Sequence, residues 1–188
     1  SGGIAILRPG MLASVQDLGR YGHRQQGICP GGALDALALA LANRVVGNAG
    51  GAAGLGLTMG GCEIRFESPT RIALPGDDFG ARLDGAPLWP CWSVPVAAGQ
   101  VLKLEAANQW SSKEGLRSWL AIAGGIDVPL VIGSRSTDLK AGFGGHLGRA
   151  LKKGDQLPLG LPALDAAQLA RRRFGLRAPE WGDEAHGP

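Results

Sequence analysis

Glycine is the residue that most restricts how this chain folds. The sequence contains 32 glycines and 12 prolines among 188 residues, and the glycines follow no three-residue repeat. That pattern excludes a collagen-like fibre and predicts a fold with many tight turns. Hydrophobic residues make up 45% of the chain, which is enough to form a core and excludes disorder as the dominant state. The length favours one domain over two small ones.

One segment, residues 33–46, has the apolar spacing of an α-helix. Its stripe recurs every three or four positions and consists of Leu34, Leu37, Leu41 and Val45. Asp35 lies in the first turn, where a carboxylate favours the positive end of the helix dipole, and Gly47 provides an end signal. We expect this helix to be the best marked one, with the stripe facing the core.

The rest of the chain has the alternating pattern of short strands. A polar, glycine-containing loop is expected from residue 10 to residue 30, and Asp84-Gly85 predicts a tight hairpin turn, because both residues tolerate positive φ. The clearest strand segments are residues 3–8, 64–66, 71–74, 101–104 and 119–123. Turn signals between them predict a mainly β fold, a barrel or a sandwich, rather than βαβ units.

The C-terminal part differs from the rest in composition. Pro162 at a first helical position predicts a helix of about three turns toward Gly175, followed by a frayed polar tail. Arg171-Arg172-Arg173 forms a basic run, but residues 161–188 carry as many acidic as basic groups, so we expect a solvated helix face. We divide the chain into a lobe at 1–160 and a linker helix with a loose tail at 161–188.

Charge and cysteine usage exclude several classes of protein. The net charge is +3, far from the dense basic face of a nucleic-acid binder. The three cysteines, Cys29, Cys62 and Cys91, have no C-x-x-C spacing and are expected to be small buried residues in a reducing compartment. The chain contains no apolar run of about 18 residues and no leader pattern, so we expect a soluble cytoplasmic protein without membrane contact.

The residues that bind metals or phosphates in other proteins do not form the required patterns. His23, His146 and His186 lack ligand spacing, so we expect no metal. The glycine-rich segment 50–56 leads into a strand, and segment 142–148 breaks the dinucleotide spacing with no helical period after it. We therefore recognise no nucleotide-binding loop in the chain.

Two polar clusters are the strongest candidates for a site. They span residues 14–22 and 133–138, and the second is joined to the glycines of 142–148. Such loops present backbone N–H groups, hydroxyls and guanidinium groups to a carboxylate or a carbonyl oxygen. Equally, their side chains hydrogen-bond to one another and hold long loops in place. The residue types alone leave both interpretations open.

Five motifs in this order resemble one protein family. They read SVQDLGRYG at 14–22, GICPGGALD at 27–35, ANRVVGN at 42–48, AGGIDVP at 123–129 and GSRSTD at 133–138. This set is similar to the allophanate-hydrolase-subunit-2 family, also called the biotin-dependent carboxyltransferase-like or Kip-antagonist family. Its bacterial members include the C subunit of 5-oxoprolinase. The resemblance covers about residues 4–160.

The resemblance implies a cyclophilin-like β-barrel and two possible activities. One is ATP-dependent opening of 5-oxoproline to glutamate together with subunits A and B, of which B is the closest partner. The other is the carboxyltransferase part of a biotin-dependent urea carboxylase. A third, non-catalytic possibility is a regulatory protein that binds a Kip-inhibitor-type partner. We favour the 5-oxoprolinase interpretation, because the start at Gly3-Ile4 fits a separate small subunit.

The family motifs also suggest which residues form the site. Both substrates offer an amide or urea carbonyl, for which hydroxyl and guanidinium donors make chemical sense. The resemblance implies Arg135 and Asp35 as catalytic residues. The substrate-binding candidates are Arg20, Gln16, Ser134, Ser136, Thr137 and Asp138.

The chain departs from the family pattern in two places. Gly56 stands where the family has a glutamate, and the family's second half, with a second cyclophilin-like lobe, has no counterpart. A lobe built to pack on a second one leaves an apolar face, so we expect self-association and no turnover by the isolated chain. The tryptophans expected on or near that face are Trp89, Trp92, Trp110 and Trp119. Neither Met11 nor Met59 precedes a lysine, so we expect no covalent biotin.

Overall fold

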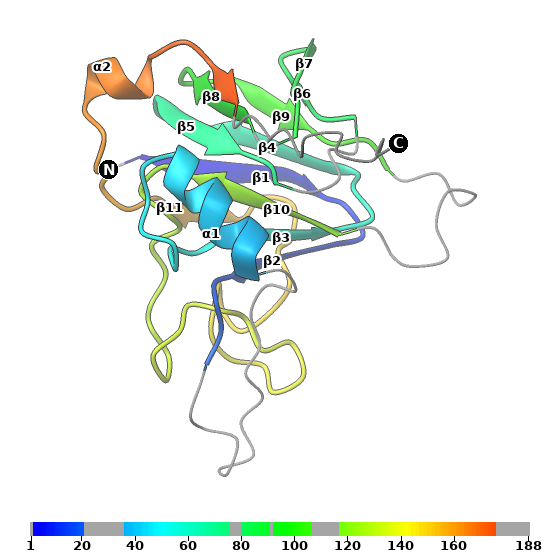
Figure 1. Cartoon of the computed structure of the whole chain (residues 1–188). Coiled ribbons are helices and arrows are strands. Elements are labelled where there is room, and N and C mark those ends of the chain that lie inside the picture. The colour runs from blue at the N-terminus through cyan, green and yellow to red at the C-terminus, as the bar shows by residue number, and fades with distance from the viewer. Residues whose placement is uncertain (1, 21–35, 76–79, 91, 107–116, 176–188) are drawn as a thin grey trace, which may run out of the picture.

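The fold consists of two antiparallel sheets that pack around one core (Figure 1). The structure is a computed structural model and describes residues 2–20, 36–75, 80–90, 92–106 and 117–175. The first sheet has six strands in the order β11 (Gln156–Pro158), β1 (Gly3–Pro9), β4 (Cys62–Phe66), β9 (Val101–Lys103), β6 (Arg82–Leu83) and β7 (Ala86–Pro87). The second has the order β12 (Phe174–Gly175), β8 (Trp92–Val96), β5 (Thr70–Ala73), β10 (Arg117–Ile122), β3 (Gly54–Thr58) and β2 (Leu12–Gln16).

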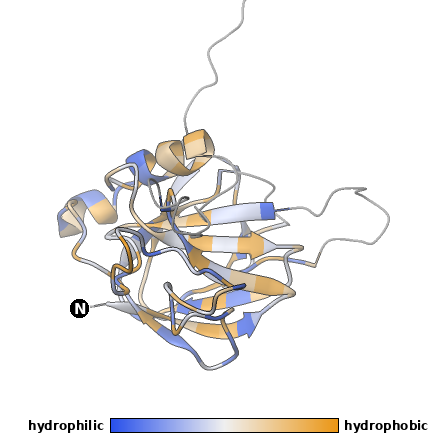
Figure 2. Cartoon of the chain, turned by 90° about the horizontal axis from the view of Figure 1, so that it is seen from below, coloured by the Kyte–Doolittle hydropathy of each residue, from blue (hydrophilic) through white to orange (hydrophobic). Residues whose placement is uncertain are grey.

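The core lies between the two sheets because each strand turns alternate apolar residues inward. In the first sheet Ile6 of β1 is opposite Ile64 of β4, which is opposite Leu102 of β9, and all three are fully buried. Figure 2 shows the corresponding alternation of hydrophobic and polar colour along the strands. The mainly β prediction is confirmed. Among the described strands no ladder joins the two sheets, so closure into a barrel stays a prediction.

The hairpin predicted at Asp84-Gly85 is confirmed. Its two turn residues have φ values of 47° and 83°, as a two-residue turn between β6 and β7 requires. The loop predicted for residues 10–30 is wrong at its start, because β2 lies at Leu12–Gln16 and pairs with β3 along its whole length. In β2 the inward apolar residues are only Ala13 and Val15, so the alternation of apolar and polar residues is too short to identify a strand among the polar residues around it.

The predicted helix forms, but it buries a different face from the one expected. Helix α1 spans Ala36–Val45, with Leu34 and Asp35 outside the described residues. Leu39 is 1% exposed, whereas Leu37 is 70% exposed. Leu39, Ala42 and Val46 pack with Trp119 and Ala121 of β10 on the outer face of the second sheet. The helix has leucines on more than one side, and the surface of β10 determines which side is buried.

The prediction of a buried cysteine is confirmed for Cys62, whereas the tryptophans differ from one another in exposure. Trp89 is exposed and Trp92 is partly buried, but Trp119 lies in the packing beneath α1, so its predicted place at an interface is wrong. Burial, with a smaller effect of Glu63, raises the pKa of the Cys62 thiol to about 12, as expected for a small core residue. Trp110, Cys29 and Cys91 lie outside the described residues.

The helix predicted after Pro162 is much shorter than expected. Helix α2 covers only Ala166–Leu169, and Asp165 and Gln168 form a capping box at its start. Phe174 belongs to β12 and pairs with Ser93. The reason lies in Arg71, whose buried guanidinium donates to the carbonyls of Leu169, Arg171 and Arg172. Those carbonyls therefore have partners without a continuing helix.

Candidate functional site

The two polar clusters meet, and a buried carboxylate joins them. Asp17, just after β2, accepts the hydroxyl protons of Ser134 at 2.6 Å and Ser136 at 2.7 Å. It also accepts the backbone N–H groups of Gly19 and Arg135, both at 2.7 Å. In Figure 1 the loops between β10 and β11 lie beyond the end of β2, where this contact forms.

The pKa of Asp17 is lowered by this arrangement. Burial alone raises the pKa of a carboxyl group, because it penalises the charged form. The hydrogen bonds from Ser134, Ser136 and the backbones of Arg135 and Gly19 outweigh that effect. Asp17 is therefore ionised at neutral pH and holds the loop that follows Ile132. Sequence reasoning did not select Asp17; the Asp-x-Gly turn of its motif was the available signal.

The 134–137 segment alternates between buried and accessible side chains. Ser134 and Ser136 are fully buried and Thr137 nearly so, and the Thr137 hydroxyl donates to the carbonyl of Val15 at 3.0 Å. Arg135 lies between the two serines, and its side chain is 35% exposed. The protons of Ser134, Ser136 and Thr137 are therefore engaged within the fold, while the guanidinium of Arg135 is accessible.

Arg20 is also buried within the loops. It is 2% exposed, its Nε donates to the carbonyl of Val131 at 2.9 Å, and its Nη2 donates to that of Ser136. The guanidinium lies 4.8 Å from the ring centre of Phe143, in cation–π range. Its Nη1 has no hydrogen-bond partner among the described residues. Arg20 thus connects three loop segments of the described chain.

Gln16 and Asp138 are the remaining substrate-binding candidates. The Gln16 amide donates to the Ser14 hydroxyl at 3.0 Å, and its buried Oε1 has no partner among the described residues. Asp138 accepts the backbone N–H groups of Lys140 and Ala141, which forms a local turn. Among the substrate-binding candidates, the structure therefore brings Arg20, Gln16, Ser134, Ser136 and Thr137 to the Asp17 contact, with Asp138 beside it. Asp35 lies outside the described residues.

Gly56 is located on the outer face of the second sheet. It pairs with Ser14 on one side and with Trp119 on the other. A β-carbon at Gly56 would lie 3.1 Å from Cγ of Gln16, so a larger residue there would displace the Gln16 side chain. The indole N–H of Trp119 is buried and has no hydrogen-bond partner in the part of the chain that the structure describes. A side chain at position 56 would therefore approach both residues.

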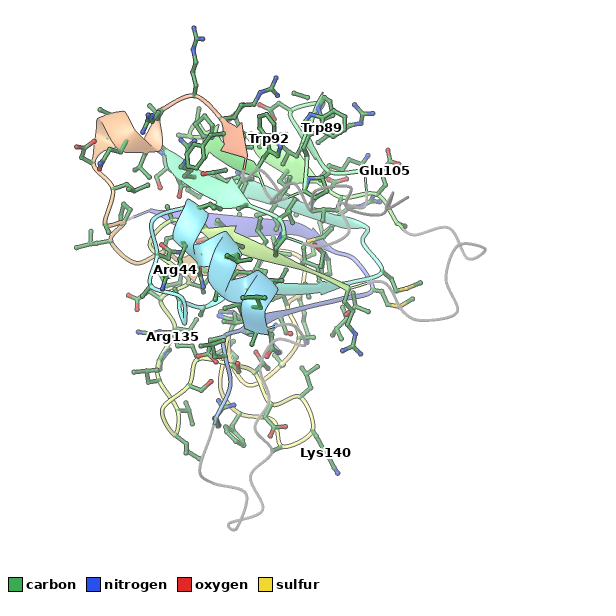
Figure 3. All side chains as sticks on the ribbon, viewed as in Figure 1. Arg44, Trp89, Trp92, Glu105, Arg135 and Lys140 are labelled. Carbon is green, nitrogen blue, oxygen red and sulfur yellow. The ribbon has the colours of Figure 1, made fainter. Side chains whose placement is uncertain are left out.

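Arg135 borders a pocket at the end of the second sheet. The pocket has a volume of about 380 Å³, within the range of small-molecule sites. Its lining consists of Ala52, Ala53, Gly124, Gly125, Ile126, Asp127, Arg135, Gly160 and Leu161. Figure 3 shows Arg135 away from Trp89 and Trp92, which lie at the top of the view. Of the candidates that the structure describes, only Arg135 lines this pocket.

Neither glycine-rich segment leads directly into a helix in the described part of the chain. Residues 50–53 form a turn that enters β3, and residues 142–148 form turns with no helix after them. Over the described ranges no group of three or more His, Cys, Asp or Glu side chains gathers for a metal ion. The helices of the described part are too short or too polar to cross a membrane.

Comparison with known proteins gives the family. The family described as "Carboxyltransferase domain, subdomain A and B" matches residues 26–185, and the chain belongs to this family. It is 46% identical to the C subunit of 5-oxoprolinase from Escherichia coli over 180 residues, which is 96% of this chain and 55% of that protein. It is 38% identical to the urea amidolyase of Lachancea kluyveri over 93% of this chain and 9% of that protein.

A solved structure confirms the fold. The crystal structure of the K. lactis urea amidolyase superposes with a TM-score of 0.78 at 36% identity, covering 88% of this chain and 10% of that one. The chain spans about half the length of the relatives that are named as C subunits of 5-oxoprolinase, 55% and 48% in two cases.

Proposed function

We propose that this chain forms part of the C subunit of a 5-oxoprolinase, which opens 5-oxoproline to glutamate together with subunits A and B. The observation that carries the proposal is the 46% identity to a protein named as the C subunit of 5-oxoprolinase, over 96% of this chain. The reaction adds water across the lactam C–N bond, leaving a free amine and a second carboxylate. ATP hydrolysis by the complex drives it, and the complex works in the cytoplasm.

The chemistry of the Arg135 pocket supports this proposal. Opening a lactam requires a bound, oriented substrate and charged or dipolar groups beside the carbonyl. Arg135 supplies a guanidinium at the edge of a pocket of small-molecule size. The network around Asp17 holds the loop that carries it. We assign Ser134, Ser136 and Thr137 to holding this loop in the free chain and Arg135 to contacting the substrate. Asp35 stays a second catalytic candidate.

The second candidate function is the carboxyltransferase part of a urea carboxylase. It is favoured by 38% identity to a urea amidolyase and by superposition on the structure of another. In that case a carboxyl group passes from biotin to a urea nitrogen. A chain without a lysine after Met11 or Met59 receives its biotin on another domain or protein. The glycine segments described above likewise leave nucleotide binding to the partners.

Reconstitution with subunits A and B tests the proposal. The expected result is glutamate release that requires this chain, 5-oxoproline and ATP, with no release by the chain alone. Arg135→Ala should lower kcat/KM for 5-oxoproline by roughly 30- to 1000-fold, equivalent to about 2–4 kcal/mol, with little change in the melting temperature. Arg8→Ala is the matched control, because Arg8 is an exposed residue of β1 whose ion pair with Glu63 spans 3.7 Å.

Three results would contradict the assignment. Carboxylation of urea by a biotin carrier in the presence of this chain, without glutamate release, would favour the urea carboxylase. Unchanged turnover by Arg135→Ala with a clearly lower melting temperature would make Arg135 a structural residue. Tight binding of a Kip-inhibitor-type protein, with neither activity, would favour the regulatory function.

A further inference from the structure

The pocket beside Arg135 has a floor that only glycine permits. Gly124 and Gly160 pack backbone to backbone, and a β-carbon on either one would overlap the carbonyl oxygen of the other. The N–H of Gly160 donates to the carbonyl of Gly125 at 3.0 Å. Gly124 and Gly125 both have positive φ values, 88° and 68°. The floor is therefore a surface of close backbone contacts without side chains, with space above it for a small ligand.

Among the described residues that line the pocket, Arg135 has the only positive side chain, and its two terminal nitrogens make no hydrogen bond to those residues. Nε of Arg135 donates to the carbonyl of Val128 at 2.9 Å, which fixes the plane of the guanidinium. Neither terminal nitrogen of Arg135 makes a hydrogen bond to the described residues; the nearest charge is Asp127 Oδ1, 3.8 Å from Nη2. Two parallel N–H groups in one plane match the two oxygens of a carboxylate.

The charges around the pocket select for a single negative charge. Asp127 is 60% exposed and is the other charged side chain of the lining. Arg135 and Asp127 cancel each other's charge, so a phosphate dianion would leave two uncompensated negative charges beside the Asp127 carboxylate, whereas a monocarboxylate leaves only one and is repelled less. Asp127 is too far from Nη2 for a hydrogen bond, so a ligand carboxylate displaces a weak ion pair only.

From this geometry we infer that the pocket binds the carboxylate of a small cyclic or compact carboxylic acid, with Arg135 as its bidentate partner. The inference rests on the proposed function and deepens it, because 5-oxoproline carries a carboxylate and urea carries none. It gives Arg135 the role of holding the substrate's carboxylate. The glycine floor, which has no side chains, then leaves room for the ring. The lactam carbonyl is left for groups outside this pocket.

Ligand titration of the whole 188-residue chain, followed by NMR, tests the inference. The probes are 5-oxoproline and 2-pyrrolidinone, the same lactam ring without the carboxylate. We expect 5-oxoproline to shift the backbone amides of Gly124, Gly125 and Gly160 in a saturable manner. We expect 2-pyrrolidinone to leave them unchanged at equal concentration. Acetate, a carboxylate without a ring, should shift the same amides at higher concentration.

Variants identify the partner of the carboxylate. Arg135→Gln should weaken 5-oxoproline binding by about 10- to 100-fold, the effect of losing hydrogen bonds to a charged group. Arg8→Gln should bind like the parent. Asp127→Asn removes the competing carboxylate and should tighten 5-oxoproline binding a few-fold. If Arg135→Gln does not fold, Asp127→Asn still tests whether the ligand's carboxylate binds beside Asp127. Equal binding of 2-pyrrolidinone, or identical affinities in parent, Arg135→Gln and Asp127→Asn, would overturn the inference.

The reconstituted complex separates this inference from the proposed function. Glutamate release with a KM for 5-oxoproline that Arg135→Gln leaves unchanged supports the proposed function and refutes the carboxylate site. Binding of 5-oxoproline that depends on Arg135, in a complex that releases no glutamate, supports the site and refutes the proposed function. A KM raised about 10-fold or more in Arg135→Gln, with a smaller change in kcat, supports both.

Discussion

The carboxylate of Asp17 accepts the backbone N–H of Arg135 at 2.7 Å. An acid at the end of β2 therefore fixes the backbone of the residue that borders the pocket, 118 positions further along the chain. The neighbours of Arg135 on both sides, Ser134 and Ser136, donate to the same carboxylate. The three contacts determine that the serines face inward and that the arginine faces out.

Asp17→Asn should disturb both stability and the pocket. An amide replaces one acceptor oxygen with an NH2 group that faces donors, so at least the hydrogen bond from the backbone N–H of Arg135 to Oδ2 is lost, and the others lose the charge of their acceptor. We expect a loss of about 3 kcal/mol in the free energy of unfolding and a higher KM for 5-oxoproline in the reconstituted complex. Urea unfolding and steady-state kinetics measure the two effects.

Asp84→Asn is the matched control for Asp17→Asn. Asp84 is an exposed turn residue with φ of 47°, a conformation that asparagine adopts readily. Its replacement should cost less than about 1 kcal/mol and leave the KM unchanged. Equal losses of stability in the two variants, or an unchanged KM in Asp17→Asn, would show that Asp17 does not position Arg135.

Asp155 makes the folded state sensitive to acid. Its carboxylate accepts two hydrogen bonds from Arg149, at 2.7 and 2.9 Å. These are the main cause of a pKa lowered from 3.8 to about 2, with smaller contributions from the Lys152 backbone and His146. Because the folded state binds this proton less readily than the unfolded state, the stabilisation is complete above about pH 4 and is lost as the pH falls toward 2.

Unfolding experiments between pH 5 and pH 2 measure this contribution. The free energy of unfolding of the parent should fall steeply below about pH 4. That of Asp155→Asn should be lower at pH 5 and should fall less steeply as the pH decreases. Asp17, whose pKa is also lowered, contributes to the pH dependence of unfolding that remains in Asp155→Asn. Parallel curves for the parent and Asp155→Asn would contradict the assigned role of the Arg149 pair.

Two leucines of α1 distinguish the buried face of the helix from the exposed one. Leu39→Ala should destabilise the fold by about 2–5 kcal/mol, as is typical for a core leucine. Leu41→Ala should cost less than about 1 kcal/mol, because its side chain is already exposed. Thermal unfolding of both variants gives the comparison. A larger loss for Leu41→Ala would mean that the stripe expected from spacing faces the core after all.

Helix α1 also shows which features of the fold the sequence alone predicts and which it does not. The strands with clear alternation, the Asp84-Gly85 turn and the existence of the helix followed from local patterns, because those patterns reflect burial of one face. The orientation of α1 did not, since its leucines occur on several sides and Trp119 and Ala121 of a distant strand select one. The proximity of the two polar clusters was suggested by their composition. The pocket could not be predicted, because Gly124 and Gly160 form its floor through backbone contacts that the residue types alone do not indicate.

Arg71 is expected to hold the C-terminal part of the described chain on the lobe. The guanidinium is almost fully buried and donates to Ser93 in β8 as well as to the carbonyls that follow α2. No carboxylate of the described residues pairs with it. In Arg71→Ala the carbonyls of Leu169, Arg171 and Arg172 lose their partner, and we expect a cost of about 3 kcal/mol.

Limited proteolysis tests whether the stability lost in Arg71→Ala is lost in the C-terminal part of the described chain. Trypsin cuts after arginine, and the side chains of Arg171, Arg172 and Arg173 are exposed, so the contacts of Arg71 protect the backbone at these sites. We expect cleavage there at least about 10-fold faster in Arg71→Ala, because cleavage follows the population of the locally opened segment. Arg82→Ala, which removes an exposed arginine from the β6–β7 hairpin, should be cut at the parental rate. If Arg71→Ala lowers the melting temperature while the cuts after residues 171–173 keep the parental rate, Arg71 stabilises the second sheet and does not hold the C-terminal segment.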